Sequence, residues 1–465
     1  MDDLRKVLHG VADVVADYHA GLDGHRVTPE LSRKSLRDLM DTKLPGGPAP
    51  TGEVIEELVR MAESGLMRSA GPRYFGFVVG GELPAALAAD MVASGWDQIA
   101  FNAVTSPAAI AFEDVAGMWL KELLGIPAGA SVGFVTGAQG ANTVGLATGR
   151  WKVLHDHGWD VGRQGLFGAP PVRVVVGEER HATVDRALRL LGLGEQSMVV
   201  VPAREDGAMD EMQLASVLGL GDGPVIVVAQ AGNVNTGAFD DLTVISEIAR
   251  ERGAWLHIDG AFGLWAGASP EHSHLVAGLE LADSWGCDGH KWLNVPYDCG
   301  YAFCAEPEVH ATAMAYTADY LTGQVAGREF GGGDLVLESS RRARGFATWA
   351  AIRSLGRSGI ADMVARCCAL ARRLAAGVAE IPGVEVVNEV VLNQVLVRVG
   401  DTATTDDVER LVQSEGTAWL GATTWRGERL LRVSVSNWST TESDIDVTVD
   451  AIARAVARAG GAQPR

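Results

Sequence analysis

The chain has 465 residues, too many for one small core, so we expect two or three packed segments. Hydrophobic residues make up 47% of the sequence, which excludes an intrinsically disordered chain. The formal net charge of −20 excludes attraction of nucleic acid or anionic membranes by the overall field, so an anionic ligand needs a local site.

The N-terminal sequence and the cysteines indicate a cytoplasmic protein. The first residues, MDDLRK, are acidic and charged with no apolar core behind them, so we expect no signal peptide. No apolar run approaches the ~18 residues that a membrane span needs. The number of cysteines is odd and their spacing matches no zinc site, so we interpret them as reduced thiols: Cys287, Cys299, Cys304, Cys367 and Cys368.

Residues 1–72 are expected to be helical, with a Pro/Gly-rich loop, LPGGPAPTG, between two helices. From 73 to 350, short β-branched runs alternate with amphipathic helical stretches, which predicts βαβ units around a buried parallel sheet. The runs are VRVVV (172–176), MVVV (198–201), VIVVA (225–229), WLHI (255–258) and YAFC (301–304). Residues 351–465 contain a predicted helix at 359–379, three β-like runs and a final helix at 444–459, which indicates a small α+β domain.

Two polar segments follow predicted strands. SVGFVTGAQGANTVGLATGR (131–150) is predicted to form a strand, a small-residue turn and a helix, and its glycines let backbone N–H groups approach a phosphate at the helix N-terminus. A plain strand-to-helix turn remains the alternative, and the spacing is not that of a dinucleotide-binding fingerprint. His181 lies where a strand is expected to lead into a helix, and a lone histidine there is more often a cap or a core residue.

The richest region begins with Asp259, at the end of the apolar run WLHI. Ligands of an open α/β sheet gather at the carboxyl ends of its strands. A carboxylate there can keep a ring nitrogen protonated, and a protonated pyridine is the electron sink of pyridoxal 5′-phosphate (PLP) chemistry. Lys291 follows in DGHKW (288–292), and burial would favour its neutral amine, which can form an imine with an aldehyde. A turn-capping aspartate and a surface lysine are the alternative interpretation of these residues.

These motifs resemble the group II PLP-dependent decarboxylases, the family of aromatic-L-amino-acid and glutamate decarboxylases, collinearly from about residue 27 to the C-terminus. The resemblance implies an α/β protein of fold type I, like aspartate aminotransferase, with a large mixed-sheet domain (73–350) and a small C-terminal α+β domain (351–465). It also implies a homodimer with active sites at the interface, in which residues 1–72 pack on the partner subunit.

The resemblance assigns roles to single residues. Lys291 takes the place of the Schiff-base lysine, Asp259 pairs with the pyridine nitrogen, and Ala261 and His181 pack on the ring. Asp288-Gly289 stands where Asn-Pro is common, so the contact of the family's asparagine with the phosphate is in doubt here. The remaining implied cofactor contacts are Ala138 and Gln139 at the phosphate, Asn233 in place of a threonine, His290, and Ser340, which would reach the partner's cofactor.

Tyr320 matches the tyrosine of the family's catalytic loop, which helps to protonate the carbon left after CO2 departs. It lies in a stretch with little periodicity (316–334), which is typical of a mobile loop, although a surface tyrosine is the alternative. The expected reaction is decarboxylation of an L-amino acid through an external aldimine and a quinonoid, with Lys291, Tyr320 and His181 as catalytic residues.

The substrate is the least determined feature of the sequence. Four aromatic residues align with the family's pocket walls and favour an aromatic substrate, although plain core positions remain open for them: Tyr74, Phe77, Trp96 and Phe101. Arg73 is a weak candidate for binding a side-chain carboxylate, so a glutamate or aspartate decarboxylase stays open. An aldehyde-forming or transaminating enzyme of the same fold also stays open, as does a catalytically silent PLP-binding regulator.

Overall fold

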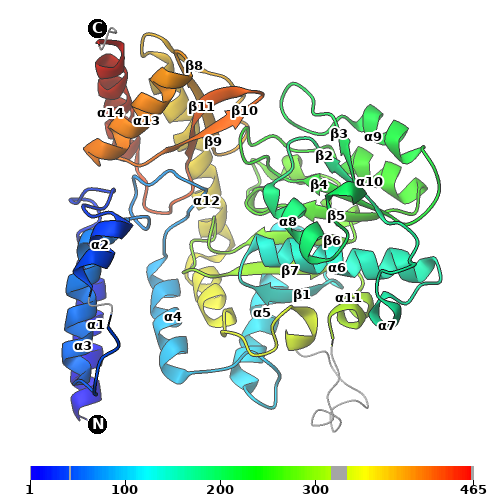
Figure 1. Ribbon diagram of the computed structural model, residues 1–465, viewed down its shortest axis with the longest axis horizontal. Coiled ribbons are helices and arrows are strands. Elements are labelled where there is room, and N and C mark those ends of the chain that lie inside the picture. The colour runs from blue at the N-terminus through cyan, green and yellow to red at the C-terminus, as the bar shows by residue number, and fades with distance from the viewer. Residues whose placement is uncertain (1, 41–42, 316–331, 462–465) are drawn as a thin grey trace. The chain divides into compact units, whose positions relative to one another are not determined.

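The computed structural model describes residues 2–40, 43–315 and 332–461 (Figure 1). They form two compact units. The large unit comprises Gly80–Ala371 and Asn388–Gln394, and the small unit comprises Met1–Val79, Arg372–Val387 and Val395–Arg465. Helix α12 (Gly345–Ala379) belongs to both and is non-helical at Gly356, where φ is 61° and ψ is −178°. The predicted three-part division of the chain remains a proposal.

A seven-stranded sheet forms the centre of the large unit, in the order β1-β7-β6-β5-β4-β2-β3. Its strands are β1 (Ser131–Val135), β2 (Arg173–Gly177), β3 (Met198–Val201), β4 (Val225–Gln230), β5 (Trp255–Asp259), β6 (Ser284–Asp288) and β7 (Gly300–Cys304). Strand β7 runs antiparallel to both of its neighbours, whereas β3, β2, β4, β5 and β6 are parallel. The sheet is therefore mixed, as the resemblance implied, and not wholly parallel as the βαβ pattern alone predicted.

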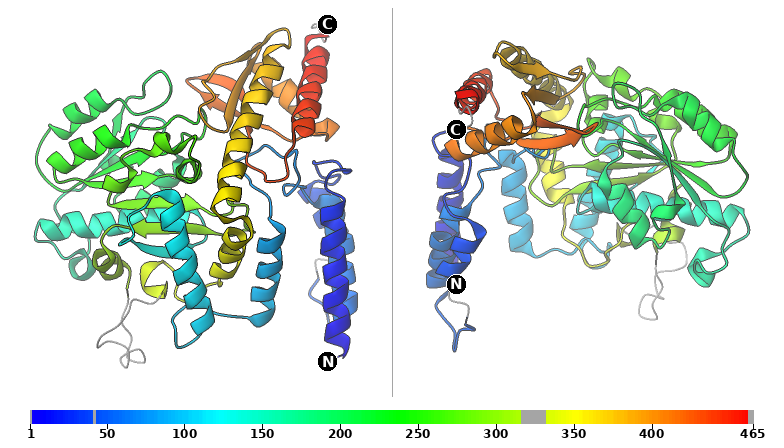
Figure 2. Two further views of the ribbon diagram at one scale, coloured as in Figure 1. Left: turned by 180° about the vertical axis from the view of Figure 1, so that it is seen from behind. Right: turned by 45° about the horizontal axis from the view of Figure 1, so that its top comes forward.

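Helices cover both faces of this sheet (Figure 2). Helix α6 packs on β4 to β7 with α8 and α11 beside it, whereas α9 and α10 pack together on the other face. The helices of the unit, apart from α12, are α4 (Pro84–Trp96), α5 (Pro107–Leu124), α6 (Ala138–Asp156), α7 (Val161–Gln164), α8 (Ala182–Leu190), α9 (Glu211–Leu218), α10 (Leu242–Glu251) and α11 (Pro307–Met314). Short 3₁₀ helices are η2 (Glu195–Ser197), η3 (Gly263–Ala268), η4 (Ser273–Val276), η5 (Leu279–Leu281) and η7 (Gly332–Leu335).

The small unit contains a four-stranded sheet in the order β10-β11-β9-β8, with helices at both ends of its sequence. Its N-terminal helices are α1 (Asp2–Ala20), α2 (Arg33–Leu39), α3 (Thr51–Ala62) and the 3₁₀ helix η1 (Glu63–Gly65). Its C-terminal elements are β8 (Val384–Val386), β9 (Gln394–Val399), α13 (Thr402–Glu415), β10 (Gly421–Trp425), β11 (Glu428–Ser434) and α14 (Glu442–Gly461). The sequence patterns indicated α1, α3, β8, β9, β11 and α14, but not α2, η1, α13 or β10.

The five cysteine side chains are buried and none forms a disulfide. Burial raises the pKa of the Cys299 thiol to about 11 and that of Cys304 to about 12. These thiols are therefore protonated at neutral pH. Among the described residues, no helix is both long enough and apolar enough to span a membrane.

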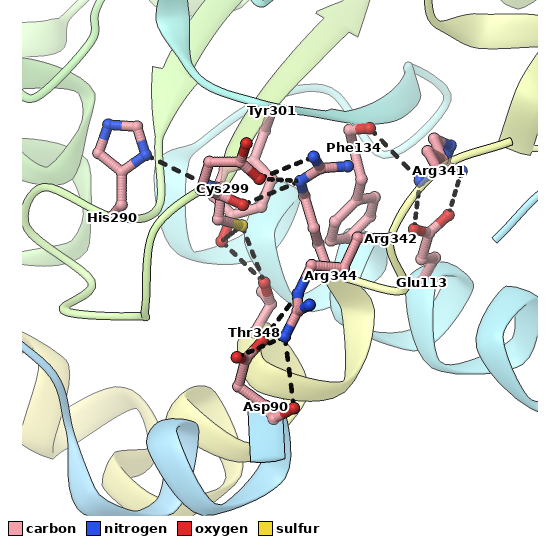
Figure 3. Close-up of polar contacts among 11 residues, drawn as sticks. Asp90, Glu113, Phe134, His290, Cys299, Tyr301, Arg341, Arg342, Arg344 and Thr348 are labelled. Carbon is pink, nitrogen blue, oxygen red and sulfur yellow. Dashed lines mark hydrogen bonds and ion pairs between the residues drawn. The ribbon is translucent and has the colours of Figure 1, made fainter. Parts of the chain in front are cut away.

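A buried ion pair anchors the segment that precedes α12. The Arg341 guanidinium donates to both carboxylate oxygens of Glu113 on α5, each at 2.5 Å, and also to the Phe134 carbonyl (Figure 3). The two side chains are only 1% and 6% exposed. Two neighbouring arginines are anchored as well, Arg342 on Asp90 and Arg344 on Asp298. These pairs hold the 341–344 segment against α4, α5 and the loop after β6.

Replacing Glu113 by Gln should destabilise the protein strongly, because the buried Arg341 charge would lose its counterion. Breaking a buried pair in this way typically costs ~3–5 kcal/mol. Glu122, on the same helix, pairs with Arg357 at the surface, where the side chains are 67% and 59% exposed. Glu122→Gln should therefore change the unfolding free energy by no more than ~1 kcal/mol. Denaturant titration of both variants checks this, and equal losses would contradict the assignment.

Candidate active site

A cavity of about 270 Å³ lies in the large unit, where the parallel strands end. Residues that follow β1, β2, β4, β5 and β6 all contribute to it, as expected for an open α/β sheet. Its lining consists of Thr136, Gly137, Ala138, Gln139, His181, Thr183, Gln230, Gly232, Val234, Asp259, Ala261, Phe262, Asp288, His290 and Lys291. Seven residues that the sequence assigned to the cofactor thus meet in one cavity.

Asp259 is the last residue of β5 and is only 5% exposed. The side-chain amide of Asn142 on α6 donates to Asp259 Oδ2 at 2.9 Å, and the Ala261 backbone N–H donates to Oδ1 at 3.3 Å. A carboxylate has about four lone-pair positions, so these two bonds leave it able to accept a further hydrogen bond from the cavity. The arrangement suits a protonated ring nitrogen as that further donor.

Lys291 reaches the cavity from the loop after β6. Its Nζ lies 3.0 Å from Asp288 Oδ2, within ion-pair distance. The burial argument from sequence favoured a neutral amine and did not foresee this partner. Asp288 Oδ1 accepts from the Ala138 backbone N–H at 2.5 Å, so the carboxylate lies at the N-terminus of α6, where the helix dipole favours an anion.

His290 is held by the loop that follows it (Figure 3). The Cys299 backbone N–H donates to His290 Nδ1 at 3.1 Å, and the ring stacks on Tyr297 with centroids 4.3 Å apart. Because Nδ1 accepts, the proton of the neutral ring is assigned to Nε2, which lies 3.4 Å from Asp288 Oδ1. Burial lowers the pKa of His290, so the ring is neutral at physiological pH.

His181 both caps a helix and lines the cavity, so the two interpretations of the sequence are compatible. As the N-cap of α8, its Nδ1 accepts from the Thr183 backbone N–H at 3.3 Å. The neutral ring therefore carries its proton on Nε2. Nearby, Gln139 in the first turn of α6 donates to the Thr183 carbonyl at 3.2 Å.

The residues of the cavity fit PLP. Lys291 is an amine for an aldehyde, Asp259 is a buried anion for a ring nitrogen, and the α6 N-terminus suits a phosphate. Gly137 leaves room at that N-terminus, because a Cβ there would lie 2.8 Å from the His290 ring and 3.1 Å from Asp288 Oδ1. Asp288 fits a bound phosphate poorly, because its carboxylate already accepts the hydrogen bond of the Ala138 N–H.

Two predicted cofactor contacts lie outside the lining of this cavity. The Asn233 side chain hydrogen-bonds to other protein groups. Its Oδ1 accepts from the backbone N–H of Asn235 and of Thr236, and its Nδ2 donates to the Glu179 carbonyl. Its neighbours Gly232 and Val234 line the cavity instead. Ser340 is exposed in the single chain, so its contact with a partner's cofactor remains a prediction. Tyr320 lies outside the described residues.

The four predicted substrate-pocket aromatics are also absent from the lining. In the small unit, Tyr74 stacks on Trp419 with centroids 4.8 Å apart, and Phe77 lies 5.5 Å from the same ring. In the large unit, Trp96 packs edge-on against Phe346, and Phe101 lies beside Gly333. Their role in substrate binding stays a prediction.

Six lining residues were not predicted from the sequence: Thr136, Thr183, Gln230, Gly232, Val234 and Phe262. Each lies within two residues of a predicted residue or at the end of a predicted strand, so strand ends were the available signal. Asn142 was not predicted either, because it is completely buried within a helix, yet it contacts Asp259. Only a fold that places α6 over β5 identifies it.

The comparisons with known proteins agree on one family. The model of the pyridoxal-dependent decarboxylase conserved domain matches residues 33–399. Tryptophan decarboxylase 1 of Oryza sativa subsp. japonica is 26% identical over 394 residues, covering 80% of this chain and 75% of that protein. An aromatic-L-amino-acid decarboxylase of Bacillus atrophaeus is 25% identical over 463 residues, covering 96% and 94%.

Solved structures show the same fold. Oryza sativa TDC, crystallised with PLP and tryptamine, superposes with a TM-score of 0.91 at 24% identity and 98% coverage of both chains. Mouse CSAD superposes with a TM-score of 0.89 at 22% identity, covering 97% of this chain and 98% of that one. The cavity with its lysine, aspartate and histidine, the shared fold and the match over residues 33–399 together show that the chain belongs to the family of pyridoxal-dependent decarboxylases.

Proposed function

We propose that this enzyme decarboxylates an aromatic L-amino acid to its amine, with PLP bound in the cavity of the large unit. The observation that carries the proposal is the meeting of Lys291 and Asp259, which are 32 residues apart by number (291 − 259), in one cavity with His181. An amine, a buried carboxylate and an imidazole are the groups that PLP-dependent decarboxylation needs.

Bound PLP would supply an aldehyde for an amine and a protonated ring that accepts electrons. Lys291 would hold the cofactor through its Nζ, and Asp259 would keep the proton at the ring nitrogen, where an electrostatic partner lowers the barrier. His181 would contact the ring, and Tyr320 or His181 would deliver a proton to the substrate Cα.

Relatives support the substrate class. Similar proteins include a tryptophan decarboxylase, aromatic-L-amino-acid decarboxylases and a tyrosine decarboxylase of Narcissus pseudonarcissus at 24% identity. Arg73, the sequence candidate for binding an acidic side chain, has other partners within the small unit. Its guanidinium donates to the Thr417 and Asp23 carbonyls, each at 2.8 Å, and to Asp444. This engagement argues against glutamate or aspartate as the substrate.

Lys291→Ala should abolish both covalent cofactor binding and CO2 release. Borohydride reduction of the PLP-loaded enzyme followed by peptide mapping should label Lys291, because its Nζ lies in the cavity. Lys121, whose Nζ donates to the Ala128 and Ala130 carbonyls, provides the control, and Lys121→Ala should keep the label and the activity. A label on any lysine other than Lys291 would refute the assignment.

Tyr320→Phe should separate amine formation from aldehyde formation. A phenol can protonate the carbon left by CO2, whereas a phenyl ring cannot, and losing a general acid typically costs ~10²-fold or more. Part of the flux should then be oxidised by O2 to aldehyde, ammonia and hydrogen peroxide. Measuring amine, aldehyde and peroxide together, with and without oxygen, checks this. If the variant forms amine at the wild-type rate, His181 becomes the proton donor.

We also propose a homodimer, and the N-terminal helices support it. Helices α2 and α3 contain no buried residue, although α3 is strongly amphipathic. Leu4 and Leu8 on α1 are 59% and 56% exposed, and Val54 and Leu58 on α3 are 47% and 62% exposed. Residues spaced by four share one helical face, so each helix presents apolar surface to solvent in the single chain. We propose that a second copy of this chain buries this apolar surface.

The double substitution Leu8→Asp and Leu58→Asp should shift the enzyme toward monomer, because each charge would be desolvated at the interface. Sedimentation velocity at several concentrations measures the shift. Met212→Asp, at an 83% exposed position on α9, serves as the control and should leave the sedimentation unchanged. A fully active, PLP-loaded monomer of the unmodified chain would rule out the dimer as the functional form.

A further inference from the structure

One face of β5 carries a polar stripe directed at α6. Trp255, His257 and Asp259 alternate along the strand, so their side chains share one face of the sheet. They are 3%, 0% and 5% exposed. Burying an imidazole, an indole N–H and a carboxylate together costs free energy unless each has a hydrogen-bond partner. Each of these three side chains therefore needs a hydrogen-bond partner inside the protein.

A continuous chain of hydrogen bonds links the three side chains. The Trp255 indole N–H donates to Ser284 Oγ at 2.9 Å, and Ser284 Oγ lies 2.8 Å from His257 Nδ1. On the other side of the ring, His257 Nε2 lies 3.0 Å from Asn142 Oδ1. Asn142 Nδ2 then donates to Asp259 Oδ2 at 2.9 Å. We call these residues, from Trp255 to Asn142, the relay.

The relay has one consistent direction. An ionised Asp259 only accepts, so the Asn142 amide must present its NH2 group there and its oxygen to His257. Nε2 of His257 therefore carries the proton, and Nδ1 accepts the Ser284 hydroxyl proton. The indole can only donate, which leaves Ser284 Oγ as its acceptor. Burial lowers the pKa of His257 to about 3, so the ring stays neutral and adds no charge beside the carboxylate.

Glycines make room for the relay. An added Cβ at Gly145, in the middle of α6, would lie 2.5 Å from the His257 ring, and one at Gly286 on β6 would lie 2.7 Å from Asn142 Oδ1. At Gly149 an added Cβ would lie 2.6 Å from the Trp255 ring. A glycine inside a helix is destabilising relative to alanine, and here the side chains of β5 fill the space that it leaves.

We propose that His257 and Asn142 are positioning residues, which orient the Asp259 carboxylate through this relay so that it holds the cofactor's ring nitrogen protonated. The inference rests on the proposed function, because it assigns the ring nitrogen to Asp259. Asn142 has a second role, since its Nδ2 also lies 3.1 Å from Thr183 Oγ1, which in turn is 2.9 Å from His181 Nδ1. One buried amide thus links the Asp259 carboxylate to the His181 imidazole through the Thr183 hydroxyl.

The first test needs neither cofactor nor activity. In the protein without cofactor, labelled with [15N]histidine, His257 should show a protonated Nε2 and an unprotonated Nδ1 from neutral pH down to about pH 4. His257→Gln assigns the signals. A charged ring near neutral pH, or the Nδ1–H tautomer, would overturn the relay whatever the enzyme catalyses.

The second test uses the enzyme loaded with PLP that is 15N-labelled at the ring nitrogen. In His257→Leu the Asn142 amide loses the donor that orients it toward Asp259, so the pH at which the ring nitrogen loses its proton should fall by up to about one unit. The kcat should fall by about 10–100-fold. Glutamine can still donate to Asn142 Oδ1, so His257→Gln should show a smaller shift. His310, also fully buried and 2.8 Å from Ser131 Oγ, provides the matched control in His310→Leu, which should shift neither.

A double-mutant cycle separates the relay from independent structural effects. If His257 acts through Asn142, then His257→Leu should have little further effect on the ring-nitrogen titration in an Asn142→Ala background. Additive shifts, or a wild-type titration in His257→Leu, would overturn the proposal while leaving the decarboxylase assignment intact. Failure of the enzyme to bind PLP at Lys291 would instead reject the proposed function, and the tautomer of His257 would still test the relay.

Discussion

A buried carboxylate at the end of β5 sets the requirements for the centre of the large unit. Asp259 is removed from water, and its charge is stable there only if donors surround it. Asn142 and the Ala261 N–H are two such donors, and the site suits a third on the cofactor. The Asn142 amide oxygen is buried as well and therefore needs a hydrogen-bond donor of its own. His257 supplies that donor. Helix α6 therefore carries polar and glycine positions on a face that would otherwise be apolar.

Asp288 creates a second requirement in the same cavity. Its carboxylate pairs with Lys291 and accepts from the N-terminus of α6, so it occupies a position where an anion is favoured. A phosphate and this carboxylate would repel one another if both were charged and adjacent. The same carboxylate contacts both the lysine and the helix N-terminus. The departure from asparagine thus changes the electrostatics of the site more than its shape.

The topology of the large unit explains why residues distant in sequence could be assigned to one site. Parallel strands that are connected through helices present their carboxyl ends at one edge, so the residues after β1, β2, β5 and β6 converge without any local signal of proximity. Ala138, Gln139, His181, Asp259, Ala261, His290 and Lys291 all followed this rule. Asn233 did not, because its loop uses the side chain for its own turns.

The sequence by itself determined the class of fold, most of the strands and the central chemistry. Runs of β-branched residues indicate buried strands directly. Asp259 and Lys291 lie in motifs that point to PLP binding and to few other functions. It did not reveal β6, because SWGCD has no β-branched residue, nor the antiparallel direction of β7, because periodicity carries no direction. Only the tertiary structure decided the partner of Lys291, the placement of Asn142 against Asp259 and the hydrogen-bond partners of His257. Each of these depends on which side chain faces which across a packed helix and sheet, and such pairing is a property of the assembled layers, not of any local segment.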